Sequence, residues 1–125
     1  MNGVLVVDDN PVNSRLLSLW LASEPYEVRQ ADSVEAARQT LATFHPRVVL
    51  LDVQLPGMDG LTWCRELRRT PRFDDVHIAI VSAFAMESDR ARAMSAGCDE
   101  FLPKPLDLER VSSLLQDWLK NPRGK

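Results

Sequence analysis

Three carboxylates of this 125-residue chain follow directly on runs of apolar residues. Asp8 and Asp9 come after residues 4–7, and Asp52 comes after residues 48–51. Short, nearly unbroken apolar runs are typical of strands that are buried on both faces of a parallel sheet, and the carboxyl ends of such strands share one edge. We therefore expect the three carboxylates to converge. Clustered carboxylates repel one another unless a divalent cation neutralises them, so the pattern predicts a site for Mg²⁺ or Mn²⁺.

Two further polar residues stand at the ends of later apolar runs, Ser82 and Lys104. A hydroxyl can donate a hydrogen bond to a phosphoryl oxygen, and an ammonium can pair with another one. Asp52 is then the candidate nucleophile, because a carboxylate accepts a phosphoryl group as an acyl phosphate when a metal and a cation disperse the charge. The set predicts phosphoryl chemistry at one edge of the sheet.

The metal ligands follow from the coordination that Mg²⁺ requires. Asp9 is expected to hold the ion directly, and Asp8 to act through metal-bound water or as a ligand partner. Asp52 and the backbone carbonyl of Gln54 complete the expected protein ligands. Each residue alone has a simpler explanation, since acids before a helix favour its dipole and Lys104 between two prolines suits a solvated turn. The recurrence of all five side chains in order favours the site.

Short apolar runs alternate with segments of helical periodicity, which is typical of a parallel α/β sheet. The expected strands are residues 3–7, 26–31, 48–52, 76–82 and 100–102. The expected helices are residues 11–24, 34–44, 61–69, 87–96 and 108–120. Asn10 and Ser33 are predicted caps, and Gly97 is a predicted helix stop.

Length and composition fit one compact domain, which we place at residues 1–120, with residues 121–125 as a tail or linker. The chain is 45% hydrophobic and has a net charge of -3. It has no long basic run, so we expect no direct contact with nucleic acid. The N-terminal apolar stretch is too short to span a membrane, so we expect a cytoplasmic protein or the cytoplasmic part of a membrane-bound sensor.

The remaining residues with reactive side chains are expected to be structural. Cys64 and Cys98 are far apart in sequence and lack the spacing of a metal site, so we expect two small buried hydrophobes. His45 and His77 have no paired base or ligand in the sequence, so we expect boundary residues without chemistry. The tryptophans are expected to serve packing.

Four motifs, taken in order, resemble the receiver domain of response regulators, the phosphoacceptors of two-component signalling. They are Val6-Val7-Asp8-Asp9-Asn10, Leu50-Leu51-Asp52-Val53-Gln54-Leu55-Pro56-Gly57-Met58-Asp59-Gly60, Val81-Ser82-Ala83 and Pro103-Lys104-Pro105. The resemblance covers nearly the whole chain. It implies a doubly wound (βα)₅ fold of the flavodoxin-like type, with strand order 2-1-3-4-5.

The resemblance also implies a role for each site residue. Asp52 matches the phosphoacceptor, Asp9 the principal metal ligand and Asp8 its acidic companion. Ser82 matches the switch hydroxyl and Lys104 the cation that contacts phosphate. The implied function is a transfer of phosphate from a partner's phosphohistidine to Asp52 with Mg²⁺. The protein would be a signalling phosphoacceptor and not an enzyme.

Phosphorylation is expected to draw Ser82 inward and to let Phe101, the matching switch aromatic, rotate from exposed to buried. The face formed by the fourth helix, fifth strand and fifth helix would change with it. Phe101 lacks the hydroxyl of the commoner Tyr, so burial alone must favour the inward rotamer. Gln54 and Phe84 are expected to flank the attacking water, and Phe84 to slow self-dephosphorylation.

The setting of the receiver stays open at this point. The Asp9-Asn10-Pro11-Val12-Asn13 and Pro105-Leu106-Asp107 stretches look similar to receivers of hybrid histidine kinases, whose partner is a histidine-phosphotransfer domain. A stand-alone regulator paired with a histidine kinase is the alternative, and the oligomeric state is unknown.

Two alternatives of other classes are disfavoured by single residues. A phosphohydrolase of the haloacid-dehalogenase type would need an acid two residues after Asp52, where Gln54 cannot shuttle a proton. A flavodoxin-like cofactor binder would need a phosphate loop after the first strand, where Asp8 and Asp9 repel phosphate.

Overall fold

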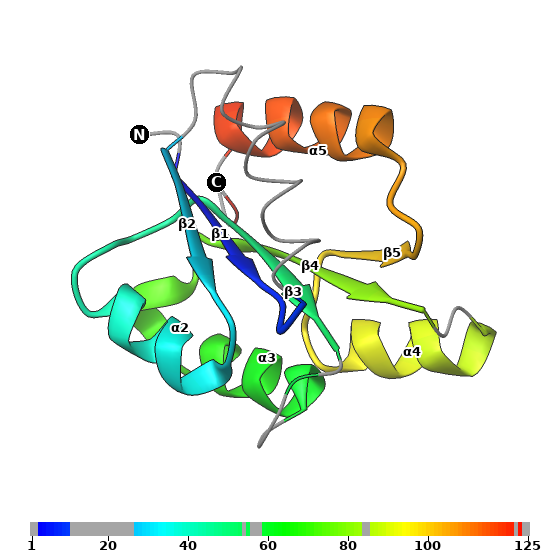
Figure 1. The fold of residues 1–125 in the computed structure, drawn as a ribbon, viewed down its shortest axis with the longest axis horizontal. Helices are drawn as coiled ribbons and strands as arrows, with labels where there is room; N and C mark the ends of the chain where they lie inside the picture. The colour runs from blue at the N-terminus through cyan, green and yellow to red at the C-terminus, as the bar shows by residue number, and fades with distance from the viewer. Residues whose placement is uncertain are drawn as a thin grey trace.

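Five parallel strands form a single sheet in the order β2-β1-β3-β4-β5 (Figure 1). The computed structural model describes residues 3–10, 27–53, 55, 59–83, 86–121 and 123. The strands are β1 (Gly3–Val7), β2 (Glu27–Ala31), β3 (Val48–Asp52), β4 (His77–Ser82) and β5 (Glu100–Pro103). The predicted doubly wound α/β fold and its strand order are therefore confirmed.

Helices cover both faces of this sheet. The described elements are α2 (Val34–Leu41), α3 (Gly60–Arg68), α4 (Glu87–Ser95), α5 (Leu108–Lys120) and a short 3₁₀ helix, η1 (Pro71–Phe73). Helices α2, α3 and α4 lie on one side and α5 on the other (Figure 1). The helix predicted at 11–24 lies outside the described residues.

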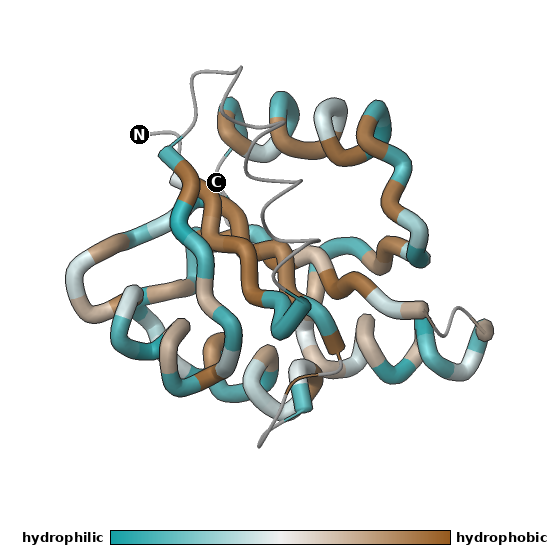
Figure 2. Tube along the Cα trace, in the orientation of Figure 1, coloured by the Kyte–Doolittle hydropathy of each residue, from teal (hydrophilic) through white to brown (hydrophobic). Residues whose placement is uncertain are grey.

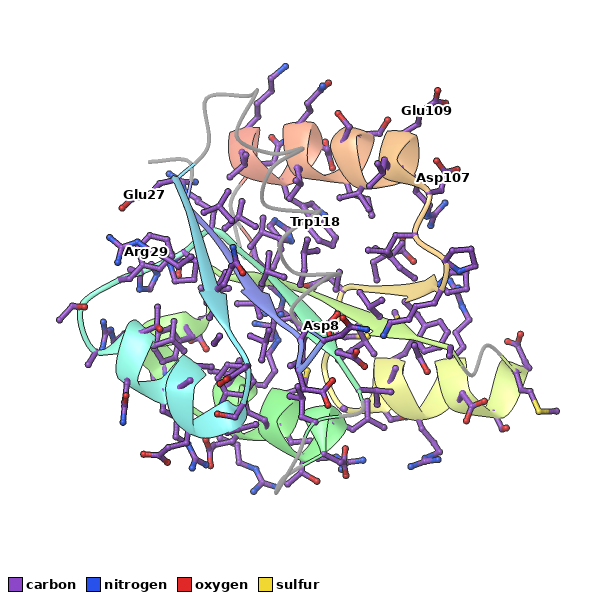
Figure 3. The ribbon with its side chains drawn as sticks, in the orientation of Figure 1. Asp8, Glu27, Arg29, Asp107, Glu109 and Trp118 are labelled. Atoms are coloured by element: carbon purple, nitrogen blue, oxygen red, sulfur yellow. The ribbon has the colours of Figure 1, made fainter. Side chains whose placement is uncertain are left out.

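The strands are buried on both faces, as their sequences predict. Along β1, Leu5 and Val7 pack into the core beneath α2 and α3, whereas Val4 and Val6 pack into the core beneath α5. Hydrophobic residues accordingly run along the central strands (Figure 2). Trp118 points from α5 toward the sheet in Figure 3 and is buried in the second core.

The predicted boundaries hold closely for most elements, with one clear error. The helix predicted at 34–44 begins as expected, because Ser33 Oγ accepts a hydrogen bond from Ala36 N at 3.1 Å. It ends at Leu41, and Thr43 N donates to Thr40 O in a tighter turn. Phe44 is buried as expected but reaches the core from the following turn. A buried aromatic at helical spacing does not by itself extend a helix.

Smaller differences concern the ends of other elements and one helix that was not expected. Helix α3 runs one residue earlier than predicted, α4 ends one residue earlier, β4 starts one residue later and β5 ends one residue later. Helix η1 was not predicted. It begins at Pro71 and buries Phe73, so a proline in its first turn and one buried apolar side chain are its sequence features.

The sheet register brings the predicted polar residues to one edge. Val7 pairs with Leu51, Asp52 with Val81, and Ser82 with Pro103. Four strands therefore end at nearly the same height. None of the described helices has both the length and the apolar composition needed to cross a lipid bilayer.

Candidate functional site

Three carboxylates meet at the carboxyl edge of the sheet, as the sequence predicts. Carboxylate oxygens of Asp8, Asp9 and Asp52 all lie within 4.8 Å of one another. Asp8 follows β1, where Figure 3 shows it at the end of the strand, and Asp52 ends the neighbouring β3. Asp52 is only 4% exposed, Asp8 is half-buried and Asp9 is exposed. The cluster thus runs from a buried acid to the solvent.

Lys104 supplies a cation to this cluster. Its Nζ donates a hydrogen bond to Asp52 Oδ2 at 2.6 Å, across 52 residues of sequence. The backbone places it there, because Lys104 N donates to Ser82 O at 2.8 Å directly after β5. Ser82 ends β4 and is 3% exposed. Ser82 therefore ends the strand next to Asp52 in the sheet, and Lys104 directly follows the strand beyond it.

The charged groups of the site shift one another's pKa values. Burial raises the pKa of Asp8, and the charge of Asp52 adds to this. The hydrogen bond from Asn10 N to Asp8 Oδ1, 2.8 Å long, and the charge of Lys104 oppose the increase. Burial alone would lower the pKa of Lys104, but the hydrogen bond to Asp52 and the nearby acids outweigh it and raise that pKa.

The donor set suits a hard divalent cation. Three carboxylates face one ammonium, so the cluster carries an excess of negative charge that a Mg²⁺ ion can neutralise. Carboxylate oxygens are also the protein ligands that Mg²⁺ prefers. Gln54, the fourth predicted ligand, lies outside the described residues, as does Phe84.

Phe101 occupies the inward position. It lies in β5, is 5% exposed and packs in the core that α2, α3 and α4 cover. The neighbouring residue, Glu100, forms two ion pairs. Its Oε2 lies 3.1 Å from Nη2 of Arg110 in α5, and its Oε1 lies 3.8 Å from Nη2 of Arg90 in α4. Phe101 thus directly follows a residue whose carboxylate contacts both α4 and α5.

The expectation that the histidines lack partners is wrong. His45 Nε2 lies 2.9 Å from Asp75 Oδ1, and His77 Nε2 lies 2.7 Å from Asn121 O. These partners are 30 and 44 residues away in the sequence, so no local motif indicates them. Both contacts involve the amino edge of the sheet or its adjoining loop, away from Asp52.

The cysteines are confirmed as buried residues without a disulfide. Burial raises the pKa of the Cys64 thiol to about 11 and that of Cys98 to about 12. Both therefore stay protonated at neutral pH, which disfavours metal binding and nucleophilic chemistry.

One residue next to the site was missed. Gly60, the first residue of α3, donates its N–H to Val53 O at 2.9 Å, directly behind Asp52. The helix predicted at 61–69 begins one residue after it. A glycine that follows the capping residue Asp59 was the available signal, because a helix can start on a glycine where backbones approach closely.

Comparison with known proteins identifies the family. The model of the response regulator receiver domain matches residues 4–116, so this chain belongs to that family. Response regulator PleD of Caulobacter vibrioides is 39% identical over 115 residues, which are 89% of this chain and 25% of PleD. The chain spans between about a quarter and about half of the length of the curated relatives it matches.

Solved structures agree with the fold and the family. A putative response regulator from Chloroflexus aurantiacus superposes with a TM-score of 0.88 at 31% identity, covering 95% of this chain and 98% of that chain. The receiver domain of sensor histidine kinase PA1611 from Pseudomonas aeruginosa superposes with a TM-score of 0.85 at 29% identity, with the same coverage. That receiver has a magnesium ion coordinated in its active site cleft.

The chain is therefore a receiver domain, a signalling module and not an enzyme in its own right. Membership of this family removes the phosphohydrolase and the flavin-binding protein from consideration.

Proposed function

We propose that this chain accepts a phosphoryl group from a partner's phosphohistidine onto Asp52, as the receiver of a two-component phosphorelay. The observation that carries the proposal is the buried Asp52 carboxylate, held between two other acids and the Lys104 ammonium. In the transfer, an Asp52 oxygen forms a bond to phosphorus while the bond from the histidine nitrogen to phosphorus breaks. The imidazole leaves with the electron pair of that bond.

Asp8, Asp9 and Asp52 would hold Mg²⁺, together with the backbone carbonyl of Gln54. The bound ion would supply positive charge against the phosphoryl oxygens. Manganese offers the same preference for oxygen ligands. Within 4.8 Å of one another, the three carboxylates lie close enough to share one ion.

Lys104 and Ser82 would contact the phosphoryl group. Lys104 already reaches Asp52, so phosphorylation requires its ammonium to exchange a carboxylate oxygen for a phosphoryl oxygen. Ser82 would donate its hydroxyl to another phosphoryl oxygen. Phosphorylation would draw Ser82 inward and favour the buried rotamer of Phe101, the one in the structure, over the exposed rotamer, and partners would sense the face formed by α4, β5 and α5.

Gln54 and Phe84 would set the lifetime of the acyl phosphate. Gln54 could orient the attacking water, while Phe84 would exclude it. Replacing Phe84 with Ala should speed the decay of the acyl phosphate, measured as loss of the adduct after removal of the donor. Unchanged or slower decay would count against this role.

The surroundings of the receiver are part of the proposal. We place the receiver at residues 1–120 in the cytoplasm, with residues 121–125 as a tail or linker. Within that segment, Arg123 Nε donates to Asp99 Oδ1 at 2.8 Å, so this side chain packs against the domain. We favour a hybrid histidine kinase with a histidine-phosphotransfer domain as donor, which the similarity to the PA1611 receiver supports. A stand-alone single-domain response regulator paired with a histidine kinase is the alternative.

Intact mass spectrometry tests the proposal. The protein is incubated with Mg²⁺ and acetyl phosphate, alone and with excess chelator, beside Asp52→Asn. A single phosphoryl adduct that is absent from both controls is the expected result. An adduct of equal yield on Asp52→Asn would refute Asp52 as the acceptor.

A further inference from the structure

The first residue of α3 lies against the backbone of the proposed phosphoacceptor. Gly60 is buried, and a Cβ placed on it would lie 2.5 Å from Asp52 O and 3.0 Å from Val53 Cα. The carbonyl carbon of Asp52 would be 3.3 Å away. All three neighbours are backbone atoms, which cannot rotate away as a side chain can.

We propose that Gly60 is a positioning residue for the phosphoacceptor. Its missing side chain lets α3 begin directly behind residues 52 and 53, and this contact fixes the place of the Asp52 carboxylate. The inference rests on the proposed function, because it assigns Gly60 a part in phosphoryl transfer at Asp52. It does not make Gly60 a catalytic residue, since the glycine acts through the backbone of its neighbour.

The contact between Gly60 and the backbone of Asp52 is fixed by hydrogen bonds and packing on both the strand side and the helix side. On the strand side, Asp52 pairs in register with Val81, and Val53 N donates to Val81 O at 3.0 Å. On the helix side, Asp59 Oδ1 accepts from Leu61 N at 2.7 Å, and Leu61 is buried in the core. A methyl group on residue 60 must therefore displace either the end of β3 or the first turn of α3.

Displacing the end of β3 would move the reacting group. The Asp52 carboxylate is 2.6 Å from Lys104 Nζ and lies in the cluster with Asp8 and Asp9. Catalytic constellations tolerate errors of only about 0.5 Å, and a misplacement of about 1 Å can lower a rate about 100-fold. A single methyl group is thus large enough to matter at this position.

Gly97 provides a matched control. It has a φ of +101°, and a Cβ there would lie 2.6 Å from Arg68 Cγ, so a side chain at residue 97 is strained as well. Its surroundings differ, because Gly97 O accepts from Arg68 Nε at 2.7 Å and Gly97 precedes β5, whereas Lys104 follows that strand at the opposite edge of the sheet. Gly97→Ala should lower stability without touching the acceptor.

The experiment compares Gly60→Ala and Gly97→Ala with the wild-type chain. We measure the rate of phosphorylation by acetyl phosphate, Mg²⁺ affinity by calorimetry, and the free energy of unfolding in urea. Gly60→Ala should be phosphorylated roughly 10- to 100-fold more slowly and bind Mg²⁺ more weakly. Gly97→Ala should match the wild type in both, despite a lower free energy of unfolding.

Several results would overturn the inference. One is a phosphorylation rate and Mg²⁺ affinity in Gly60→Ala that equal those of the wild type. Another is a loss of rate and Mg²⁺ affinity in both variants that is proportional to their loss of free energy of unfolding. If Gly60→Ala is unfolded in buffer, the measurements are repeated with trimethylamine N-oxide, which favours the compact state. A chain that stays unfolded there also counts against a positioning role.

The failure of the proposed function would look different. In that case the wild type itself takes no phosphoryl group, and the Mg²⁺ affinities of the two variants still decide whether Gly60 positions the acidic cluster.

Discussion

Partly or fully buried acids lie at both ends of the sheet, but their neighbours differ. At the carboxyl edge, Asp52 lies with two other acids and one ammonium. At the amino edge, Asp99 accepts from Arg68 Nη2 at 2.7 Å, from Arg123 Nε at 2.8 Å and from Ile78 N at 2.8 Å. One carboxylate is crowded by like charges, and the other is paired with two guanidinium groups.

This difference separates a site from a structural element. Removing one partner of a buried charge pair leaves the other charge uncompensated, whereas crowded like charges oppose folding and persist where a ligand relieves them. Asp99 connects α3, β4, β5 and Arg123 in the tail. Under the proposed function, the carboxyl edge binds a cation and a phosphoryl group.

The largest expected effect comes from isosteric substitution at the two edges. Asp99→Asn should lower the free energy of unfolding by about 2–4 kcal/mol, because Arg68 is 12% exposed and loses its counter-charge. Asp52→Asn should change it by less than about 1 kcal/mol, since the lost pair with Lys104 is offset by relief from Asp8. Urea unfolding without metal measures both. Equal losses would break the comparison.

Mg²⁺ should stabilise the carboxyl edge alone. At 100 times its dissociation constant, the ion should raise the free energy of unfolding by about 2.7 kcal/mol in the wild type. Asp8→Asn should lose most of this gain, because it removes one carboxylate from the cluster. Asp99→Asn is the control and should keep the gain. A metal effect that is the same in Asp8→Asn would place the ion elsewhere.

Removing one of the two guanidinium groups from Asp99 should have a smaller effect. Arg123 is 37% exposed, and Asp99 keeps its bonds to Arg68 and Ile78. We therefore expect Arg123→Gln to cost about 1 kcal/mol or less in urea unfolding. A loss as large as that of Asp99→Asn would mean that the tail, and not Arg68, holds this edge.

The smallest effect is a pH dependence of opposite sign at the two ends. Burial raises the pKa of Asp8 above 3.8, so the metal-free protein should lose stability as the pH rises from 3.8 through that pKa. Burial alone would raise the pKa of Asp75, but the bond and charge of His45 lower it below 3.8. The stability from Asp75 is present above pH 3.8 and is lost as the pH falls through the lowered pKa.

Urea midpoints across acidic pH, without metal, measure these contributions. Asp8→Asn should remove the first dependence and His45→Gln the second. The prediction fails if either variant follows the pH profile of the wild type.

Much of this fold could be predicted from local sequence. The apolar runs placed β1 and β3 at their observed bounds, and the helical period of residues 108–120 placed α5 at its observed bounds. The acidic edge followed from the same runs, because the ends of parallel strands coincide. These features depend on residues that are neighbours in sequence or on a general property of sheets.

The parts that were missed depend on the path of the chain. Arg68 and Asp99 are 31 residues apart, and nothing near either one indicates the other. The early end of α2 and the role of Phe44 depend on how the turn packs beneath β1, where the ring approaches Gly3. The glycine after Asp59 indicates a helix start, but the contact of Gly60 with Asp52 depends on the distance between two backbones.

The most direct test of the account locates the phosphoryl group. After incubation with acetyl phosphate and Mg²⁺, borohydride reduction of the acyl phosphate marks the modified aspartate, and peptide mass spectrometry identifies it. We expect a single mark at Asp52, the buried acid that Lys104 contacts. A mark at Asp8 or Asp9, or at Asp99 on the opposite edge, would contradict the central claim that the crowded carboxyl edge makes Asp52 the acceptor.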